Sequence, residues 1–147
     1  MSDREKTRVL FVCVHNSARS QMAEALLKEL GGEEYHVESA GFEPSSVNPL
    51  AVETMRQIGI DISRNETHSV FDFFKEGRLY EYVITVCDDT DESRCPIFPG
   101  ITERLHWPFP DLAALSGSQE EKLTQAAEIR DEIKERISQW VEEKSLT

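Results

Sequence analysis

The residues best suited to chemistry stand in one short stretch, where Cys13 is followed by five residues, then by Arg19 and Ser20. Residues 9–14, which include Cys13, form an apolar, β-branched run that predicts a buried strand. A helical pattern follows at residues 21–30. A loop between the end of a strand and the start of a helix gathers unpaired backbone N–H groups, and the helix dipole adds partial positive charge. The junction is therefore predicted to bind an anion.

The spacing between Cys13 and Arg19 has a chemical reason. A loop of this length can wrap its amides around a tetrahedral oxyanion, and a planar guanidinium can close the ring with a two-pronged contact. The same surroundings stabilise a thiolate, so Cys13 is predicted to be a nucleophile, with Ser20 as a hydrogen-bond donor to its sulfur. Asn16 is expected to take the positive φ that so tight a loop needs. The residues predicted to bind the oxyanion are Val14, His15, Asn16, Ser17, Ala18, Arg19 and Ser20.

A simpler interpretation exists for each of these residues on its own. A lone cysteine at the end of a strand is usually a small buried apolar residue, and Arg19 alone would be a residue of the helix surface. The complete Cys-x5-Arg-Ser string between a strand and a helix favours the functional interpretation. We assign His15 a place in the loop but no chemistry of its own.

Composition and charge exclude several classes of protein. A length of 147 residues predicts a single domain over residues 1–147 with its own core. The net charge of −12 argues against a nucleic-acid partner, whose phosphates require a basic surface. The charged N-terminus has no apolar region of a signal peptide, and no apolar run approaches membrane length, so we expect no membrane association. Three cysteines are an odd number for a disulfide scaffold, which predicts a cytoplasmic protein whose cysteines carry chemistry.

Strand and helix patterns alternate along the chain. This alternation predicts an α/β protein with a doubly wound parallel sheet. Asn48 is placed to cap the second helix, which begins at Pro49, and the phenylalanine-rich third helix is interpreted as core. The expected strands cover residues 9–14, 35–40, 82–86 and 103–107, and the expected helices cover residues 21–30, 49–58, 70–74 and 123–141.

The string Cys13-Val-His-Asn-Ser-Ala-Arg-Ser20, followed by Gln-Met-Ala-Glu24, resembles the oxyanion loop of arsenate reductases built on the low-molecular-weight protein tyrosine phosphatase fold. The loop string is typical of the superfamily, and the Gln-Met-Ala-Glu sequel with the two later cysteines favours the thioredoxin-coupled reductase branch. The resemblance implies a sheet of four parallel strands in the order 2-1-3-4, flanked by helices. It continues through Glu38-Ser-Ala-Gly41, Asn48-Pro49, Gly59-Ile-Asp-Ile-Ser63, Thr85-Val-Cys87, Cys95-Pro96 and His106-Trp107.

The implied strand order gives the other two cysteines a meaning. Cys13 and Cys87 end neighbouring strands, which lie about 4.8 Å apart, and a disulfide needs Cα atoms roughly 4.4–6.8 Å apart. Cys95 follows Cys87 through a polar stretch with no apolar anchor. The resemblance thus implies a redox relay among Cys13, Cys87 and Cys95. Zinc held by Cys87, Cys95 and His106 is the alternative, but their spacing fits no common zinc pattern, and we assign no metal site.

Asp111 follows the fourth expected strand and matches the general-acid aspartate of the family by its distance from the pair His106-Trp107. In that role it would donate a proton to the departing oxygen. The alternative is an aspartate that caps a turn or a short helix, which is common after proline. The catalytic residues implied are therefore Cys13, Arg19, Cys87, Cys95 and Asp111.

The resemblance implies that the chain is an enzyme that reduces arsenate to arsenite by a thiol–disulfide relay, in arsenic detoxification. The alternative enzyme is a low-molecular-weight protein tyrosine phosphatase that hydrolyses phosphate monoesters through a phosphocysteine on Cys13. Cys87 and Cys95 discriminate between the two, because ester hydrolysis needs neither. A third class is a module that binds phosphate or senses redox state without turnover.

Cofactors and partners follow from the same resemblance. The substrate is an oxyanion of the arsenate or phosphate type, and thioredoxin is the expected reductant. No cofactor is required, although some relatives bind potassium near residues that match Asn16, Glu24 and Ser39, which leaves potassium as an option. We expect a monomer.

Overall fold

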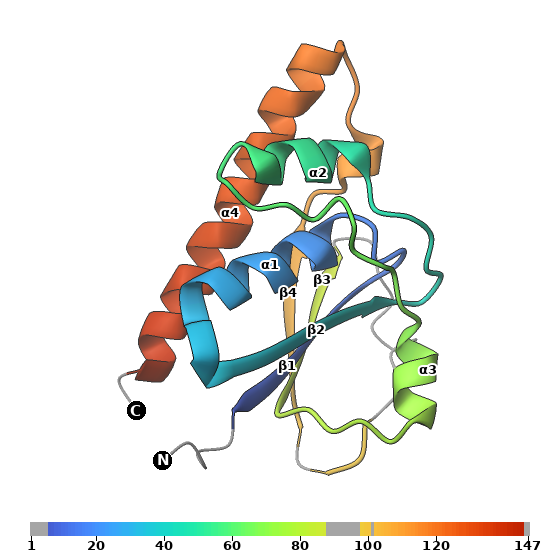
Figure 1. Ribbon diagram of the computed structural model, residues 1–147, viewed down its shortest axis with the longest axis vertical. Helices are drawn as coiled ribbons and strands as arrows, with labels where there is room; N and C mark the ends of the chain where they lie inside the picture. Colours follow the sequence, from blue (N-terminus) through green and yellow to red (C-terminus); the bar gives the residue numbers. More distant parts are fainter. Residues whose placement is uncertain (1–5, 88–97, 101, 146–147) are drawn as a thin grey trace.

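The computed structural model describes residues 6–87, 98–100 and 102–145. In this part of the chain a sheet of four parallel strands has the order β2-β1-β3-β4. The order and the parallel pairing confirm the expected doubly wound sheet (Figure 1). The strands are β1 (Thr7–Cys13), β2 (Tyr35–Gly41), β3 (Tyr82–Cys87) and β4 (Glu103–Phe109), and the α-helices are α1 (Arg19–Gly31), α2 (Pro49–Arg56), α3 (Val70–Lys75) and α4 (Gln119–Ser145).

Strand β1 is buried on both faces because helices cover both sides of the sheet. Phe11 packs into a core with α1, α2 and α4, whereas Leu10 and Val12 pack on the other face with α3. This explains why the strand is a continuous apolar run in the sequence. The sheet thereby carries Cys13 and Cys87, at the ends of two adjacent strands, to one edge of the fold.

Helices α2 and α4 are fastened to each other by a buried arginine. Arg130 of α4 donates from Nη1 to the carbonyl of Thr54, 2.9 Å away, and to Oε1 of Gln57, 3.1 Å away. At the other end of α2, the side chain of Asn48 accepts a hydrogen bond from the amide of Leu50 at 2.7 Å. This bond confirms the predicted cap, and it fixes where the chain enters α2.

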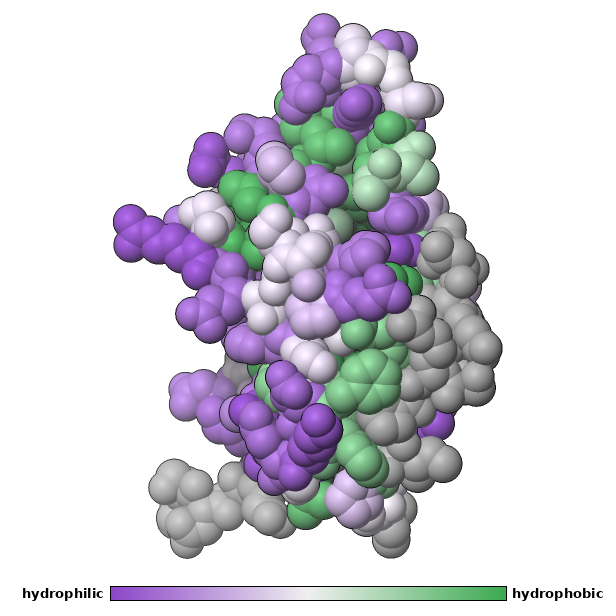
Figure 2. All heavy atoms as spheres, turned by 90° about the vertical axis from the view of Figure 1, so that its right-hand side faces the viewer, coloured by the Kyte–Doolittle hydropathy of each residue, from purple (hydrophilic) through white to green (hydrophobic). Residues whose placement is uncertain are grey.

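The interpretation of α3 as core is wrong for two of its three phenylalanines. Val70 and Phe73 are buried, but Phe71 and Phe74 are 38% and 41% exposed. A helix of six residues can turn only one side to the sheet, so consecutive apolar residues cannot all be buried. Figure 2 shows apolar surface in green on the side of the molecule that α3 occupies in Figure 1.

Strand β4 is longer than the sequence predicts. It continues through Pro108 to Phe109, and not only to Trp107. Proline is tolerated there because β4 is an edge strand, so the missing N–H leaves no neighbour unpaired. The extension brings Phe109 beside the candidate site. Within the described ranges, no helix is both long and apolar enough to span a membrane.

Candidate active site

Cys13 is the last residue of β1, Arg19 is the first residue of α1, and the loop between them is held by Asn16. Asn16 is fully buried and has φ of 52°, as predicted for a tight loop without glycine. The backbone N–H of His68 donates to Oδ1 of Asn16 at 2.9 Å. The amide nitrogen of Asn16 is therefore turned the other way, and it donates to the hydroxyls of Ser20 and Ser39 at 2.8 and 2.9 Å.

The orientation of Asn16 decides what Ser20 can do. Because the Ser20 hydroxyl accepts from Asn16, its own proton is available to Sγ of Cys13, which lies 3.1 Å from the Ser20 oxygen. The hydrogen bond from the Cys87 side chain, the bonds from Ser20 and the charge of Arg19 lower the pKa of the Cys13 thiol to about 5, although burial acts in the opposite direction. At neutral pH the sulfur is a thiolate, which is the nucleophilic form.

Cys87 lies beside Cys13, the predicted nucleophile, as expected from the adjacent strands. Both cysteines are buried, and the backbone N–H of Val14 donates to Sγ of Cys87 at 3.1 Å. One amide of the oxyanion loop thus already contacts a second sulfur. Cys95, the third predicted member of the relay, lies outside the described residues.

Among the described residues, no group of three His, Cys, Asp or Glu side chains is placed to hold a metal ion. Cys95, a member of the zinc alternative, is not among these residues, so the alternative stays untested. His106 instead contacts a threonine of β3, with its Nδ1 atom 2.6 Å from Oγ1 of Thr85.

Arg19 and Asp111 face each other across the site. The Arg19 side chain is almost fully buried, donates from Nη1 to the carbonyl of Phe109 at 3.0 Å, and places Nη2 3.7 Å from Oδ1 of Asp111. Asp111 also accepts a hydrogen bond from the amide of Ala113 at 2.9 Å, which caps a short 3-10 helix at Leu112–Ala114. The structure thus contains the capping role that was the alternative for Asp111, together with the proximity that general acid catalysis would need.

The residues that the resemblance linked to potassium do not fit a potassium ion in this structure. The Ser39 hydroxyl donates to Oε1 of Glu24, and Asn16 turns its nitrogen and not its oxygen toward Ser39. The other carboxylate oxygen of Glu24 accepts from the ammonium of Lys28 at 2.7 Å. Hydrogen bonds already use the oxygen atoms that would coordinate a cation, and Lys28 supplies the positive charge.

Sequence reasoning missed two contributors to the site. The first is His68, whose backbone N–H fixes the Asn16 amide, and the second is the segment at residues 42–48, whose amides bond to the carbonyls of the loop. Both act through backbone atoms, so no pattern of side-chain types marks them. The signal that could have indicated the segment is Gly41, which precedes it, because a glycine at the end of a strand often marks a close approach of two backbones.

Comparison with known proteins agrees with this geometry. The family model described as low molecular weight phosphotyrosine protein phosphatase matches residues 8–147. Arsenate reductase 2 of Staphylococcus saprophyticus is 42% identical over 136 residues, which cover 92% of this chain and 97% of that protein.

Two solved structures are similar over nearly the whole chain. Thioredoxin-dependent arsenate reductase Cg_ArsC1′ of Corynebacterium glutamicum is 32% identical with a TM-score of 0.69, and the match covers 97% of this chain and 63% of the other. An arsenate reductase in the phosphate binding state is 29% identical with a TM-score of 0.73, and that match covers 93% of this chain and 98% of the other. The chain belongs to the low molecular weight phosphotyrosine protein phosphatase family, together with the arsenate reductases that it matches along nearly its full length.

Proposed function

We propose that the chain reduces arsenate to arsenite by a three-cysteine relay that starts at Cys13. The observation that carries the proposal is the second buried thiol. Cys87 accepts a hydrogen bond from Val14 in the oxyanion loop, and it contributes most to the low pKa of Cys13. Hydrolysis of a phosphate ester does not need this thiol, whereas reduction of an oxyanion does.

The first step is attack of the Cys13 thiolate on arsenic. The loop amides and the guanidinium of Arg19 hold the arsenate oxygens and stabilise the charge that develops on them. A sulfur–arsenic bond forms, and an oxygen leaves as water after it receives a proton from Asp111. Arsenic is still pentavalent in this adduct, so no electrons have yet moved.

The second step transfers the electrons. The thiolate of Cys87 attacks Sγ of Cys13, the sulfur–arsenic bond breaks, and its electron pair stays on arsenic, which leaves as trivalent arsenite. The two sulfur atoms are oxidised to a disulfide between Cys13 and Cys87. The thiolate of Cys95 then attacks Cys87, which frees the Cys13 thiolate and leaves a disulfide between Cys87 and Cys95.

An external dithiol must reduce this last disulfide, and we infer that thioredoxin does so. The thioredoxin-dependent relative of Corynebacterium glutamicum supports this choice. The relay starts from three reduced cysteines and therefore needs a reducing compartment, which favours the cytoplasm. We also infer that turnover does not depend on potassium, because both carboxylate oxygens of Glu24 already accept hydrogen bonds, one from Ser39 and one from Lys28.

A coupled assay tests the proposal directly. The full chain is mixed with thioredoxin, thioredoxin reductase, NADPH and arsenate, and arsenite is measured alongside NADPH oxidation. We expect one arsenite for each NADPH consumed, and no NADPH oxidation when phosphate replaces arsenate. Hydrolysis of an aryl phosphate without any arsenite production would favour the phosphatase. Phosphate binding without turnover of either substrate would favour a binding module.

A further inference from the structure

A short segment that follows β2 is bonded along the outside of the oxyanion loop. In Figure 1 the teal coil after β2 runs beside the blue loop after β1. Four amides of this segment donate to four carbonyls of the loop, and the donors follow one another along the chain in the same order as the acceptors. The bonds are Phe42 to Cys13 at 3.2 Å, Glu43 to Val14 at 2.7 Å, Ser45 to His15 at 3.1 Å and Asn48 to Ser17 at 2.9 Å.

These bonds determine where the loop amides point. In a trans peptide the C=O and the following N–H point in opposite directions. A carbonyl that bonds to the segment therefore directs the next N–H to the opposite side, toward the predicted anion site. The peptide between Cys13 and Val14 demonstrates this, because its carbonyl accepts from Phe42 and its N–H donates to Sγ of Cys87 in the site.

Only a glycine at position 41 allows the two backbones to come this close. Gly41 lies opposite Cys13 in the pairing of β1 with β2. A Cβ atom there would lie 2.7 Å from the backbone nitrogen of Asn16 and from the carbonyl oxygen of Val14. Both contacts are with backbone atoms, so a side chain at position 41 must displace the loop itself.

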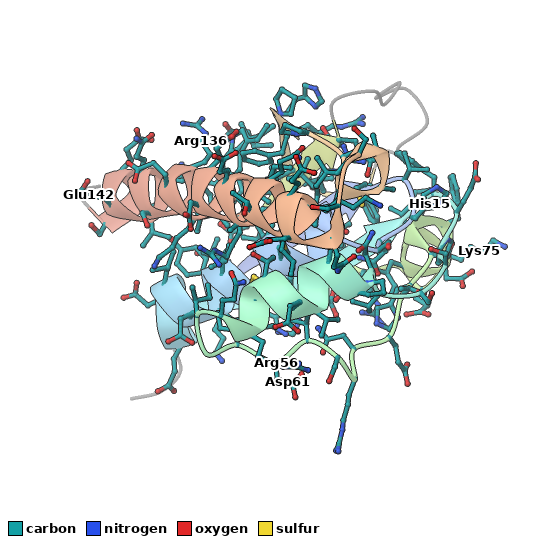
Figure 3. All side chains as sticks on the ribbon, turned by 90° about the horizontal axis from the view of Figure 1, so that it is seen from above. His15, Arg56, Asp61, Lys75, Arg136 and Glu142 are labelled. Atoms are coloured by element: carbon teal, nitrogen blue, oxygen red, sulfur yellow. The ribbon has the colours of Figure 1, made fainter. Side chains whose placement is uncertain are left out.

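The segment is anchored at both ends, so it can impose its shape on the loop. At its start, the amide of Gly41 donates to the carbonyl of His68 at 2.8 Å. At its end, Asn48 caps α2, which Arg130 ties to α4. The His15 ring adds a side-chain bond, in which Nδ1 donates to the carbonyl of Glu43 at 2.9 Å. Figure 3 shows His15 on the side of the molecule that also carries Lys75, far from Glu142 near the end of α4.

We propose that residues 42–48 form a brace that holds the oxyanion loop in its anion-binding shape before the anion arrives, and that Gly41 is the positioning residue that admits this brace. The inference rests on the proposed function only in taking the loop as the oxyanion site. A loop whose amides already point toward the anion site loses little conformational entropy when an oxyanion binds, so the binding is stronger.

The test compares two glycines with similar crowding. In Gly41→Ala the added methyl presses on the loop backbone, and in the control Gly31→Ala it presses on the Tyr35 ring, with its nearest atom at 2.4 Å. Binding of inorganic phosphate is measured by calorimetry, and ionisation of Cys13 by the pH dependence of its alkylation. Neither readout needs arsenate turnover. The proposal about the brace can therefore be refuted without refuting the proposed arsenate reduction, and the reverse also holds.

For Gly41→Ala we expect phosphate affinity to fall by about tenfold or more and the alkylation profile of Cys13 to move to higher pH. For Gly31→Ala we expect a loss of thermal stability with both readouts as in the unmodified chain. A folded Gly41→Ala variant with unchanged phosphate affinity and unchanged alkylation profile would overturn the proposal.

A second pair of variants keeps the test decisive if Gly41→Ala does not fold. Ser45→Pro removes the N–H that bonds to His15. The control Ser116→Pro alters an exposed serine outside the brace, whose amide makes none of the four bonds named above and whose preceding residue, Leu115, already has the extended backbone that a proline requires. We expect phosphate affinity to fall about threefold or more in Ser45→Pro and to stay unchanged in Ser116→Pro. Equal phosphate affinity in the two proline variants would overturn the brace.

Discussion

Cys13 and Cys87 occupy equivalent positions at the ends of two adjacent strands, yet their surroundings differ. Cys13 lies at the start of a loop that returns a serine hydroxyl and a guanidinium to its sulfur. Cys87 receives a backbone N–H from that same loop. We infer from this difference that the Cys13 sulfur, which is surrounded by cationic and hydroxyl groups, attacks the oxyanion, and that the Cys87 sulfur beside it then attacks Cys13.

The largest expected effect follows removal of the nucleophile. Cys13→Ser should abolish arsenate reduction and any hydrolysis of an aryl phosphate, because both reactions begin with the same thiolate. The coupled assay and release of a chromogenic phenol measure the two rates, and circular dichroism checks the fold. Substantial retention of either rate would show that the two activities do not share this site.

Removal of the second sulfur should separate the two activities. Cys87→Ser should stop arsenite production but leave hydrolysis of the aryl phosphate within about threefold of the unmodified rate, since hydrolysis needs no second thiol. The same two assays apply. If hydrolysis disappears as well in a folded variant, Cys87 has a structural role and the division of tasks fails.

Arg19→Lys tests whether the guanidinium near Cys13 is needed to bind the oxyanion. A lysine keeps the charge but cannot form the two-pronged contact or reach the carbonyl of Phe109 in the same way, so kcat/KM for arsenate should fall about 100-fold. Arg56→Lys, at an exposed residue paired with Glu53, is the matched control and should be neutral. Equal kinetics in the two variants would place Arg19 outside the reaction.

The smallest of these effects concerns the pH dependence of Cys13. Because its pKa is lowered to about 5, the thiolate persists down to that pH, and its reactivity is lost as the pH falls through it. Ser20→Ala removes a hydrogen bond that lowers this pKa, so the pKa should rise. Alkylation should become several-fold slower between about pH 5 and 7 and converge with the unmodified rate in more alkaline solution.

Ser63→Ala is the control for this profile, because Ser63 is an exposed serine whose hydroxyl bonds to Asp61. Its alkylation profile should match that of the unmodified chain. A Ser20→Ala profile that also matches would mean that Ser20 does not stabilise the thiolate.

Much of this arrangement could be predicted from the sequence because its causes are local. The apolar run of β1, the proline and cap at the start of α2 and the Cys-x5-Arg string each follow from neighbouring residues. The left-handed backbone of Asn16 was predictable for the same reason, since few residue types tolerate it.

What escaped prediction depends on contacts between distant segments. The exposed sides of Phe71 and Phe74 follow from which face α3 turns to the sheet, which composition does not encode. The brace at residues 42–48 is made of backbone hydrogen bonds, which the side-chain types do not indicate. The ion pair of Lys28 with Glu24 bears on potassium binding only because β2 brings Ser39 within hydrogen-bond distance of Glu24. The strand order itself came from the family resemblance and not from the pattern of apolar residues.

The central claim is that Cys87 attacks Cys13, and a single-turnover experiment on Cys95→Ala tests it most directly. Without the third thiol, one addition of arsenate should release one equivalent of arsenite and leave the enzyme with a disulfide between Cys13 and Cys87. Peptide mass spectrometry under non-reducing conditions identifies this bond. Release of arsenite without a Cys13–Cys87 disulfide, or rapid repeated turnover of this variant with thioredoxin, would contradict the assigned order.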